Sequence, residues 1–397
     1  MKRILILACL SAGWGWGQTT ATDVVLRAMK DEIARGRTLR VVGDPPYFIE
    51  YTLDDAQMLS VSASYGSILS DRSNRIRQPR VRIRVGDRKL DNSNHIFSDA
   101  YRGARFDPSQ MAIDDNYDVL RLGFWLATDR AYKQALESLA RKKAALKNIT
   151  STETLDDFSE APAVSLLFPV PVRTVDVAGW RKKVAATSAV FSRYPTVLSS
   201  EATASFSFTR SYLVNNEGTE VRIPDNLVDA RVRAAGLAPD GMVVRDYAVF
   251  LGSDPGQLPP DAELAAAARR VADNVTALAK APVIDSYSGP VLFEGVAGAQ
   301  ILAELVGRSL AGVRRPVSDP ERPLNIPTGE LEGRLGSRLL PEWMDAVDDP
   351  TQKQWRGLPL LGYYPIDVEG VVPKPLPVFE KGVLKTYFTT RQPVTGT

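Results

Sequence analysis

The sequence has 397 residues, of which 44% are apolar and 24% are charged; these ordinary proportions exclude a disordered chain. Lysine and arginine total 49 against 47 acidic residues, and this net charge of +2 excludes an overall field that would recruit nucleic acid or an anionic membrane. The length predicts two or three domains, each burying its own core.

The first 17 residues have the pattern of a secretory signal peptide. Lys2 and Arg3 precede an apolar run from Ile4 to Ala12, and small residues then lead to Gly17, after which we expect cleavage. The run is too short to span a bilayer, so no permanent membrane anchor is expected. We therefore expect the protein to be secreted or periplasmic.

Histidine and cysteine are almost absent. Cys9 is the only cysteine; as a lipid-attachment site it would leave an unusually short apolar region, so a lipoprotein is the less favoured alternative. After cleavage no cysteine remains for a disulfide. His95 is the only histidine, and its isolation in a polar stretch predicts a surface position. Between Gln18 and Thr397 the chain therefore cannot build an ordinary zinc site from histidine and cysteine.

A first domain is expected over residues 18–160. Apolar residues at helical spacing predict a helix from Asp23 to Arg35, and alternating patterns predict antiparallel strands. Arg80, Arg82 and Arg84 would share one strand face, which is either solvated or, as the less favoured alternative, a polyanion site. The predicted strands cover residues 47–52, 57–65 and 81–85, and a second helix covers residues 129–146.

Two further domains are expected over residues 161–283 and 284–397. The central one has strands that we expect to form a second antiparallel sheet, between helices at 177–193 and 260–280. The last joins an apolar strand, residues 289–293, to a helix beginning near Gly298, and its remainder is rich in loops. The fold class is α+β, with mixed or antiparallel sheets and flanking helices. The central strands cover residues 202–214, 220–223, 228–235 and 242–250.

The stretch from Tyr287 to Gly312 is a strand that turns through small residues into a helix. This stretch resembles the TldD/PmbA family of peptidases and relatives, once called modulators of DNA gyrase. In active members the helix carries His-Glu-x-x-x-His, whose imidazoles hold zinc while the glutamate acts as general base. Ligands five residues apart are rotated by about 140° on an ideal helix, so we expect the helix to bend or end there.

The resemblance places the two imidazole positions on Ala303 and Arg308, the general base on Glu304 and a glycine on Gly307. Alanine offers no lone pair, and a permanently cationic arginine repels a divalent metal. The motif is therefore degenerate, and no metal is assigned to this chain. Glu304 could act as a base toward a metal supplied by a partner, but a solvated residue paired with Arg308 is the favoured interpretation.

Two other segments extend the resemblance. The first begins at Arg210 and contains Asn215, Glu217 and Gly218, and it predicts two strands joined by a tight turn. The second contains Asp367, Glu369 and Gly370, in an Asp-x-Glu-Gly pattern. Asp367 and Glu369 could bind a cation if they share a strand face, but a turn before Gly370 is favoured. This second segment continues to Phe379-Glu-Lys-Gly-Val-Leu384, near the end of the sequence.

The resemblance implies an exported, non-catalytic subunit or peptide-binding partner of a protease assembly, acting as a homodimer or as a heterodimer with a motif-bearing TldD-like subunit. No cofactor is expected in this chain alone, and nucleic acid is not expected as a partner. One alternative is an active metallopeptidase, whose zinc ligands lie beyond Thr397 or on a partner. Another is a stand-alone envelope binding module.

Overall fold

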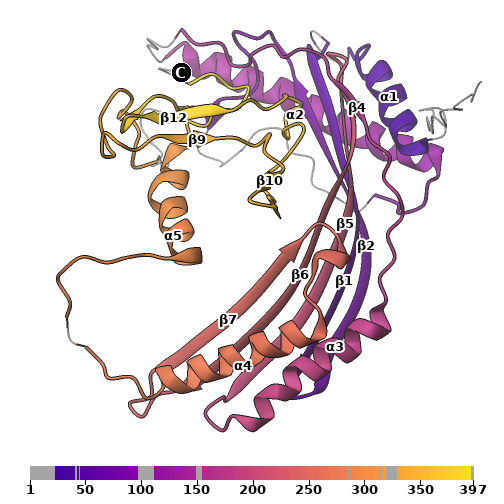
Figure 1. Ribbon diagram of the computed structural model, residues 1–397. Coiled ribbons are helices and arrows are strands. Elements are labelled where there is room, and N and C mark those ends of the chain that lie inside the picture. The colour runs from indigo at the N-terminus through magenta and orange to yellow at the C-terminus, as the bar shows by residue number, and fades with distance from the viewer. Residues whose placement is uncertain are drawn as a thin grey trace, which may run out of the picture.

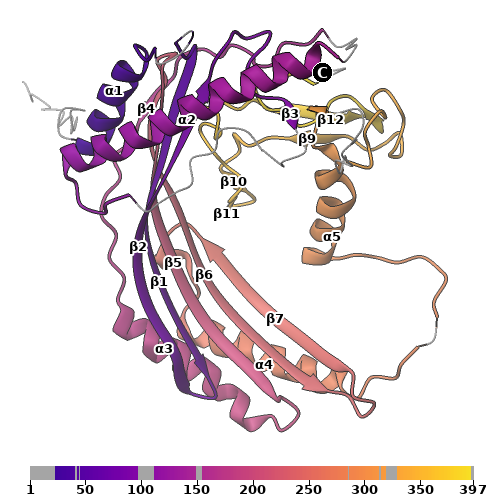
Figure 2. The same cartoon turned by 180° about the vertical axis from the view of Figure 1, so that it is seen from behind.

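The computed structural model describes residues 23–40, 43, 45–96, 111–148, 154–284, 286–312, 314–318 and 329–394 (Figure 1). A long curved sheet of six strands dominates it, in the order β2-β1-β5-β6-β4, with β7 also paired to β6. The predicted signal peptide and Cys9 lie outside the described residues. The helices and the C-terminal part are arranged on the two faces of this sheet (Figures 1 and 2).

The strands confirm the antiparallel pattern, except that β4 runs parallel to β6, and they are longer than predicted. The expectation of two sheets is wrong. β1 pairs with both β2 and β5, so strands from both halves share one sheet. The predicted break at Asp54 and Asp55 does not occur, because Ser211 donates to Asp54 and arginines of β2 donate to Asp55. The domain limits stay a prediction. The strands are β1 (Phe48–Ser64), β2 (Ser67–Arg84), β4 (Ser165–Leu167), β5 (Ser199–Asn215), β6 (Glu220–Leu237) and β7 (Val243–Gly252).

Four helices cover one sheet face. α1 (Val24–Gly36) and α2 (Tyr117–Leu146) lie at one end, and α3 (Val177–Ala189) and α4 (Asp261–Leu278) lie at the other (Figure 1). Side-chain caps begin the first three: the Leu26 amide donates to Asp23 at 3.0 Å, and Asn116 and Asp176 act similarly. The Asn116 cap explains why α2 begins before the predicted residue 129. Short 3₁₀ turns, Val190–Arg193 and Pro255–Gln257, follow α3 and β7.

The C-terminal part lies on the opposite sheet face, at the α1/α2 end (Figures 1 and 2). Ile366 packs there against Leu213 and Val221. Short strands build this part: β9 (Ala346–Asp348), β12 (Leu376–Glu380) and β13 (Val383–Leu384) form one sheet, and β10 (Gln354–Trp355) pairs with β11 (Leu358–Pro359). β3 (His95–Ile96) and β8 (Val317–Ser318) form a parallel pair.

The prediction of a surface position for His95 is wrong. Its exposed fraction is 5%, and its Nδ1 lies 3.4 Å from the Ser93 carbonyl oxygen. The polar residues before it fold inward: Asn92 Oδ1 accepts from the Val85 amide at 2.8 Å, and the Asp91 amide donates to Asp157. A polar sequence thus lies inside because its own groups provide the partners that water would otherwise supply.

The predicted strand at residues 289–293 does not form. Val291, Leu292 and Phe293 are exposed, with 82% of Leu292 accessible, and none belongs to a described strand. Of the predicted strand and helix, only the helix forms, as α5 (Gly295–Leu302). Across the described residues, no helix has the length and apolar character needed to cross a membrane.

Candidate functional site

The degenerate motif lies on a π turn rather than at a simple bend. α5 continues directly into a π-helical turn, Ala303–Gly307, and a 3₁₀ turn, Arg308–Leu310. The Arg308 amide donates to the Ala303 carbonyl, a bond from residue i to i−5. One turn of a π-helix holds more residues than one turn of an α-helix, so positions 303 and 308 come close to the same side. The backbone that suits ligands five residues apart is therefore present.

The side chains on this turn do not fit zinc. Ala303 has no donor atom, and Arg308 Nη1 lies 3.0 Å from Glu304 Oε2. This confirms the predicted pair, and both side chains are exposed, by 78% for Arg308 and 57% for Glu304. Such a solvated pair is worth about 0–1 kcal/mol. Within the described ranges, no three His, Cys, Asp or Glu side chains gather where they could hold a metal ion.

The second motif segment forms the predicted tight turn between β5 and β6. Asn215 Oδ1 accepts from the amides of Glu217 and Thr219, each at 3.0 Å. Gly218 has φ +105°, a conformation that side chains rarely tolerate. The turn holds the Glu217 carboxylate at the junction between the large sheet and the C-terminal part.

Glu217 binds two arginines that are far away in the sequence. Arg88 Nη2 donates to its Oε1 at 2.7 Å, and Arg391 Nη2 donates to the same oxygen at 2.9 Å. Burial alone would raise the pKa of Glu217, but the bonds from Arg391 and Arg88 outweigh it and hold that pKa below its usual range. The Arg391 guanidinium also lies 4.0 Å from the centre of the Phe158 ring.

The segment with Asp367, Glu369 and Gly370 forms the favoured turn, whereas cation binding there stays an untested alternative. Asp367 Oδ1 accepts from the amides of Glu369 and Val371, each at 2.8 Å. Gly370 has φ +76°, and a Cβ atom there would lie 3.3 Å from the Thr219 side chain. Asp367 Oδ1 thus stabilises the turn through backbone donors.

Glu369 completes the junction. Its Oε2 accepts from the Arg391 amide at 2.6 Å and its Oε1 accepts from Arg82 at 3.0 Å, while Arg82 also lies 3.3 Å from Glu50. Burial raises the pKa of Glu50, only partly offset by Arg82. We call this set the junction cluster. It comprises Glu50, Arg82, Arg88, Glu217, Glu369 and Arg391.

Sequence reasoning missed the arginines of the junction cluster. The strand face of Arg80, Arg82 and Arg84 was interpreted as solvated, but Arg84 is buried and donates to Asp91 at 2.6 Å. The signal was present as alternate arginines on β2, but Glu369, the partner of Arg82, is distant in the sequence. Arg210 does not join the cluster; it lies farther along β5, on the helix-covered face, and α5 is also remote from the cluster.

The comparisons with known proteins agree with this architecture. Residues 286–394 match the family model described as the PmbA/TldA metallopeptidase C-terminal domain. No curated protein matches the chain. Two crystal structures share the fold: a candidate modulator of a DNA gyrase from Thermotoga maritima (15% identity, TM-score 0.54) and TldE from Thermococcus kodakarensis (14% identity, TM-score 0.54).

The overlap with these structures extends well beyond the matched domain. The first match covers 86% of this chain and 66% of the other, and the second covers 91% and 69%, so this chain spans about two thirds of the length of each. The junction turns and the π turn lie where the sequence motifs predicted them. Residues 286–394 are therefore similar to the C-terminal domain of the PmbA/TldA metallopeptidases, and the chain shares its fold with these two structures.

Proposed function

We propose that this chain is an exported, non-catalytic subunit that combines with a motif-bearing TldD/PmbA-like chain in a peptidase assembly. The observation that carries the proposal is the π turn at residues 303–307, which brings positions 303 and 308 toward one side but carries Ala303 and Arg308 where the resemblance expects imidazoles. This chain would contribute walls and peptide contacts, and the partner would contribute zinc.

The exposed state of α5 supports a partner there. The helix has eight residues and buries none of them, whereas a free helix that short is marginal in water. Val296, Leu302 and Leu305 are exposed on this segment, and it follows the exposed apolar run at 291–293. β7 adds Val243, Tyr247, Val249 and Leu251, which are also exposed. Apolar surface on this scale marks an interaction site.

A second subunit of the same family is the partner that we favour. The π turn brings positions 303 and 308 together, but Ala303 and Arg308 cannot hold zinc, which fits a subunit whose relative supplies the chemistry. The proposed location outside the cytoplasm rests on the N-terminal sequence pattern alone, and cleavage near Gly17 stays a prediction.

The test is reconstitution with a motif-bearing relative that is exported by the same cell. The pure chain is expected to contain no stoichiometric zinc and to cleave no unfolded peptide, and the mixture is expected to form a complex in light scattering. Leu305→Asp should abolish the complex, whereas Leu69→Asp should not; both leucines are 62% exposed, but Leu69 lies on β2, away from α5.

The alternative of an active peptidase makes the opposite prediction. Stoichiometric zinc in the pure protein, with cleavage that Glu304→Gln abolishes, would overturn the proposal in favour of catalysis by this chain. A monomer that ignores the relative and retains a peptide without cleaving it would favour the stand-alone binding module.

A further inference from the structure

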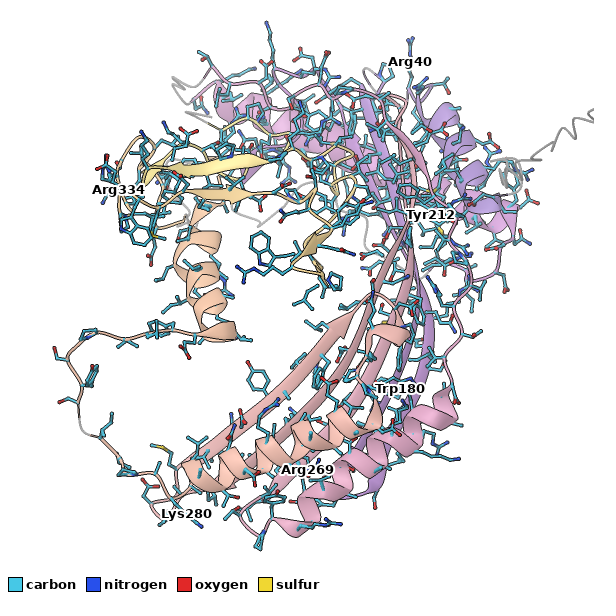
Figure 3. All side chains as sticks on the ribbon, viewed as in Figure 1. Arg40, Trp180, Tyr212, Arg269, Lys280 and Arg334 are labelled. Atoms are coloured by element: carbon cyan, nitrogen blue, oxygen red, sulfur yellow. The ribbon has the colours of Figure 1, made fainter. Side chains whose placement is uncertain are left out.

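A cavity lies on the helix-covered face of the large sheet, between its two helical layers. On one side is the apolar cluster under α1 and α2, which includes Tyr212, and on the other is the cluster under α3, which includes Trp180 (Figure 3). Between these clusters the sheet carries polar residues, since Asp55 on β1 lies opposite Arg210 on β5 in the strand register. The cavity encloses about 460 Å³, a volume typical of small-molecule sites.

The acidic group in the cavity is already neutralised. Asp55 accepts two bonds from Arg75, at 2.9 and 2.8 Å, and a further bond from Arg77 at 2.9 Å. Burial alone would raise the pKa of Asp55, but these arginines hold it below its usual range. Arg173, at the rim, pairs with Asp254 at 2.8 Å.

Arg210 is the cation in the cavity that forms no ion pair with the described residues, and the carboxylates of Asp55 and Asp23 act on it only from a longer distance. Its guanidinium makes two long contacts, with the Tyr212 hydroxyl and the Val170 carbonyl, both at 3.5 Å. A guanidinium has five N–H donors, and their fork matches a carboxylate. The side chain is partly buried, so leaving this charge without a strong partner has a cost that an anionic ligand would remove.

The remaining walls indicate the class of anion. Phe208, Ile113 and Val170 give the cavity an apolar side next to the guanidinium, and Gln57 and Asn226 give neutral polar groups. A single unpaired cation suits a monoanion better than a phosphate dianion. We propose that this cavity binds a carboxylate that carries an apolar or aromatic group, with the carboxylate held by Arg210.

This proposal is independent of the proposed partner role, because the cavity and α5 lie on opposite sides of the sheet (Figures 1 and 2). If the complex with a second subunit did not form, the proposal for the cavity would still stand. If the cavity bound no ligand, the proposal for α5 would still stand. The ligand could be a free small acid or the C-terminus of a short peptide, two sources with the same chemistry.

The test is calorimetric titration of the full protein with matched probes. N-acetylphenylalanine is expected to bind about 10- to 150-fold more tightly than its carboxamide, because the charge-assisted bonds exist only for the acid. Inorganic phosphate is expected to bind more weakly than the acid. Tighter binding of Ala-Ala-Ala-Phe with a free C-terminus would identify a peptide as the source, and tighter binding of N-acetylphenylalanine would identify a free acid.

Arg210→Met should erase the difference between acid and amide. Arg245→Met is the matched control, because Arg245 is an exposed arginine on β7 of the same sheet, and it should leave binding unchanged. If Arg210→Met does not fold, Arg210→Lys keeps the charge but removes the fork, and weaker binding of the acid is expected. Equal affinity for acid and amide in the native protein, or unchanged preference in both Arg210 variants, would overturn the proposal.

Discussion

Replacing Glu217 by Gln is expected to lower the free energy of unfolding by about 2–3 kcal/mol. Removing one member of a buried ion pair costs roughly 3–5 kcal/mol, because the remaining charge stays buried and unpaired. Glu217 is 14% exposed, and Arg391 keeps a 2.7 Å bond to the Ser159 carbonyl, so we take a value below that range. The glutamine keeps the size of the side chain, so the loss reports on charge.

The assay is urea unfolding followed by fluorescence and by circular dichroism, whose agreement checks that one transition is measured. Glu304→Gln is the control, because it makes the same change in the exposed pair with Arg308 and should cost at most about 1 kcal/mol. The variant Glu217→Gln/Arg391→Met should be more stable than the sum of its single changes predicts. Equal losses for Glu217→Gln and Glu304→Gln would refute the buried-pair reasoning.

The same reasoning fixes a pH dependence. The pKa of Glu217 is lowered in the folded protein, so its contribution to stability is present above the unfolded value of about 4.3 and is lost as pH falls through the lower folded value. The stability difference between the native protein and Glu217→Gln should therefore shrink below about pH 4.

Two further predictions concern His95 and the π turn. Burial lowers the pKa of His95, so folded protein should lose stability as pH falls from about 6.5 through that lower value; His95→Asn should remove this loss, and the single imidazole NMR signal should titrate below 6.5. A titration midpoint above 6.5 would contradict this. Ala303→His/Arg308→His should create a two-ligand site with about half the roughly 10–16 kcal/mol of four-ligand zinc sites, a Kd between about 1 μM and 0.2 mM, measured by Zn²⁺ calorimetry. Glu304 variants of that double mutant should show whether the carboxylate adds a third ligand. A zinc affinity no higher than that of the native chain would contradict the placement of positions 303 and 308 on the same side.

Local sequence patterns predicted the helices and strands themselves better than the residues at which they begin and end. The helix at residues 23–35 and the strands of the sheet were recovered because their apolar spacing is local. Asp54 and Asp55 concealed the continuity of β1, since acids inside a strand normally indicate a break. The partners of these two acids lie on β2 and β5, too far along the sequence for a local pattern to include them.

The residues of the candidate site likewise fall into two groups, those that a local sequence pattern predicted and those that it missed. Ala303, Glu304 and Arg308 were found because the motif is contiguous, and their pairing followed from helical spacing. The junction cluster was missed because Arg82 and Glu369 are 287 positions apart and Arg88 and Glu217 are 129 apart. Spacing also predicted a bend at the motif, whereas the backbone resolves that spacing with a π turn.

The length of the sheet strands has a mechanical consequence. β1 and β5 have 17 residues each, and β2 and β6 have 18, so each runs for roughly 56–60 Å. β1, β2 and β5 each contact helices of both layers. Hydrogen bonds join these strands along nearly their whole length. The sheet therefore holds the two helical layers in a fixed position relative to each other.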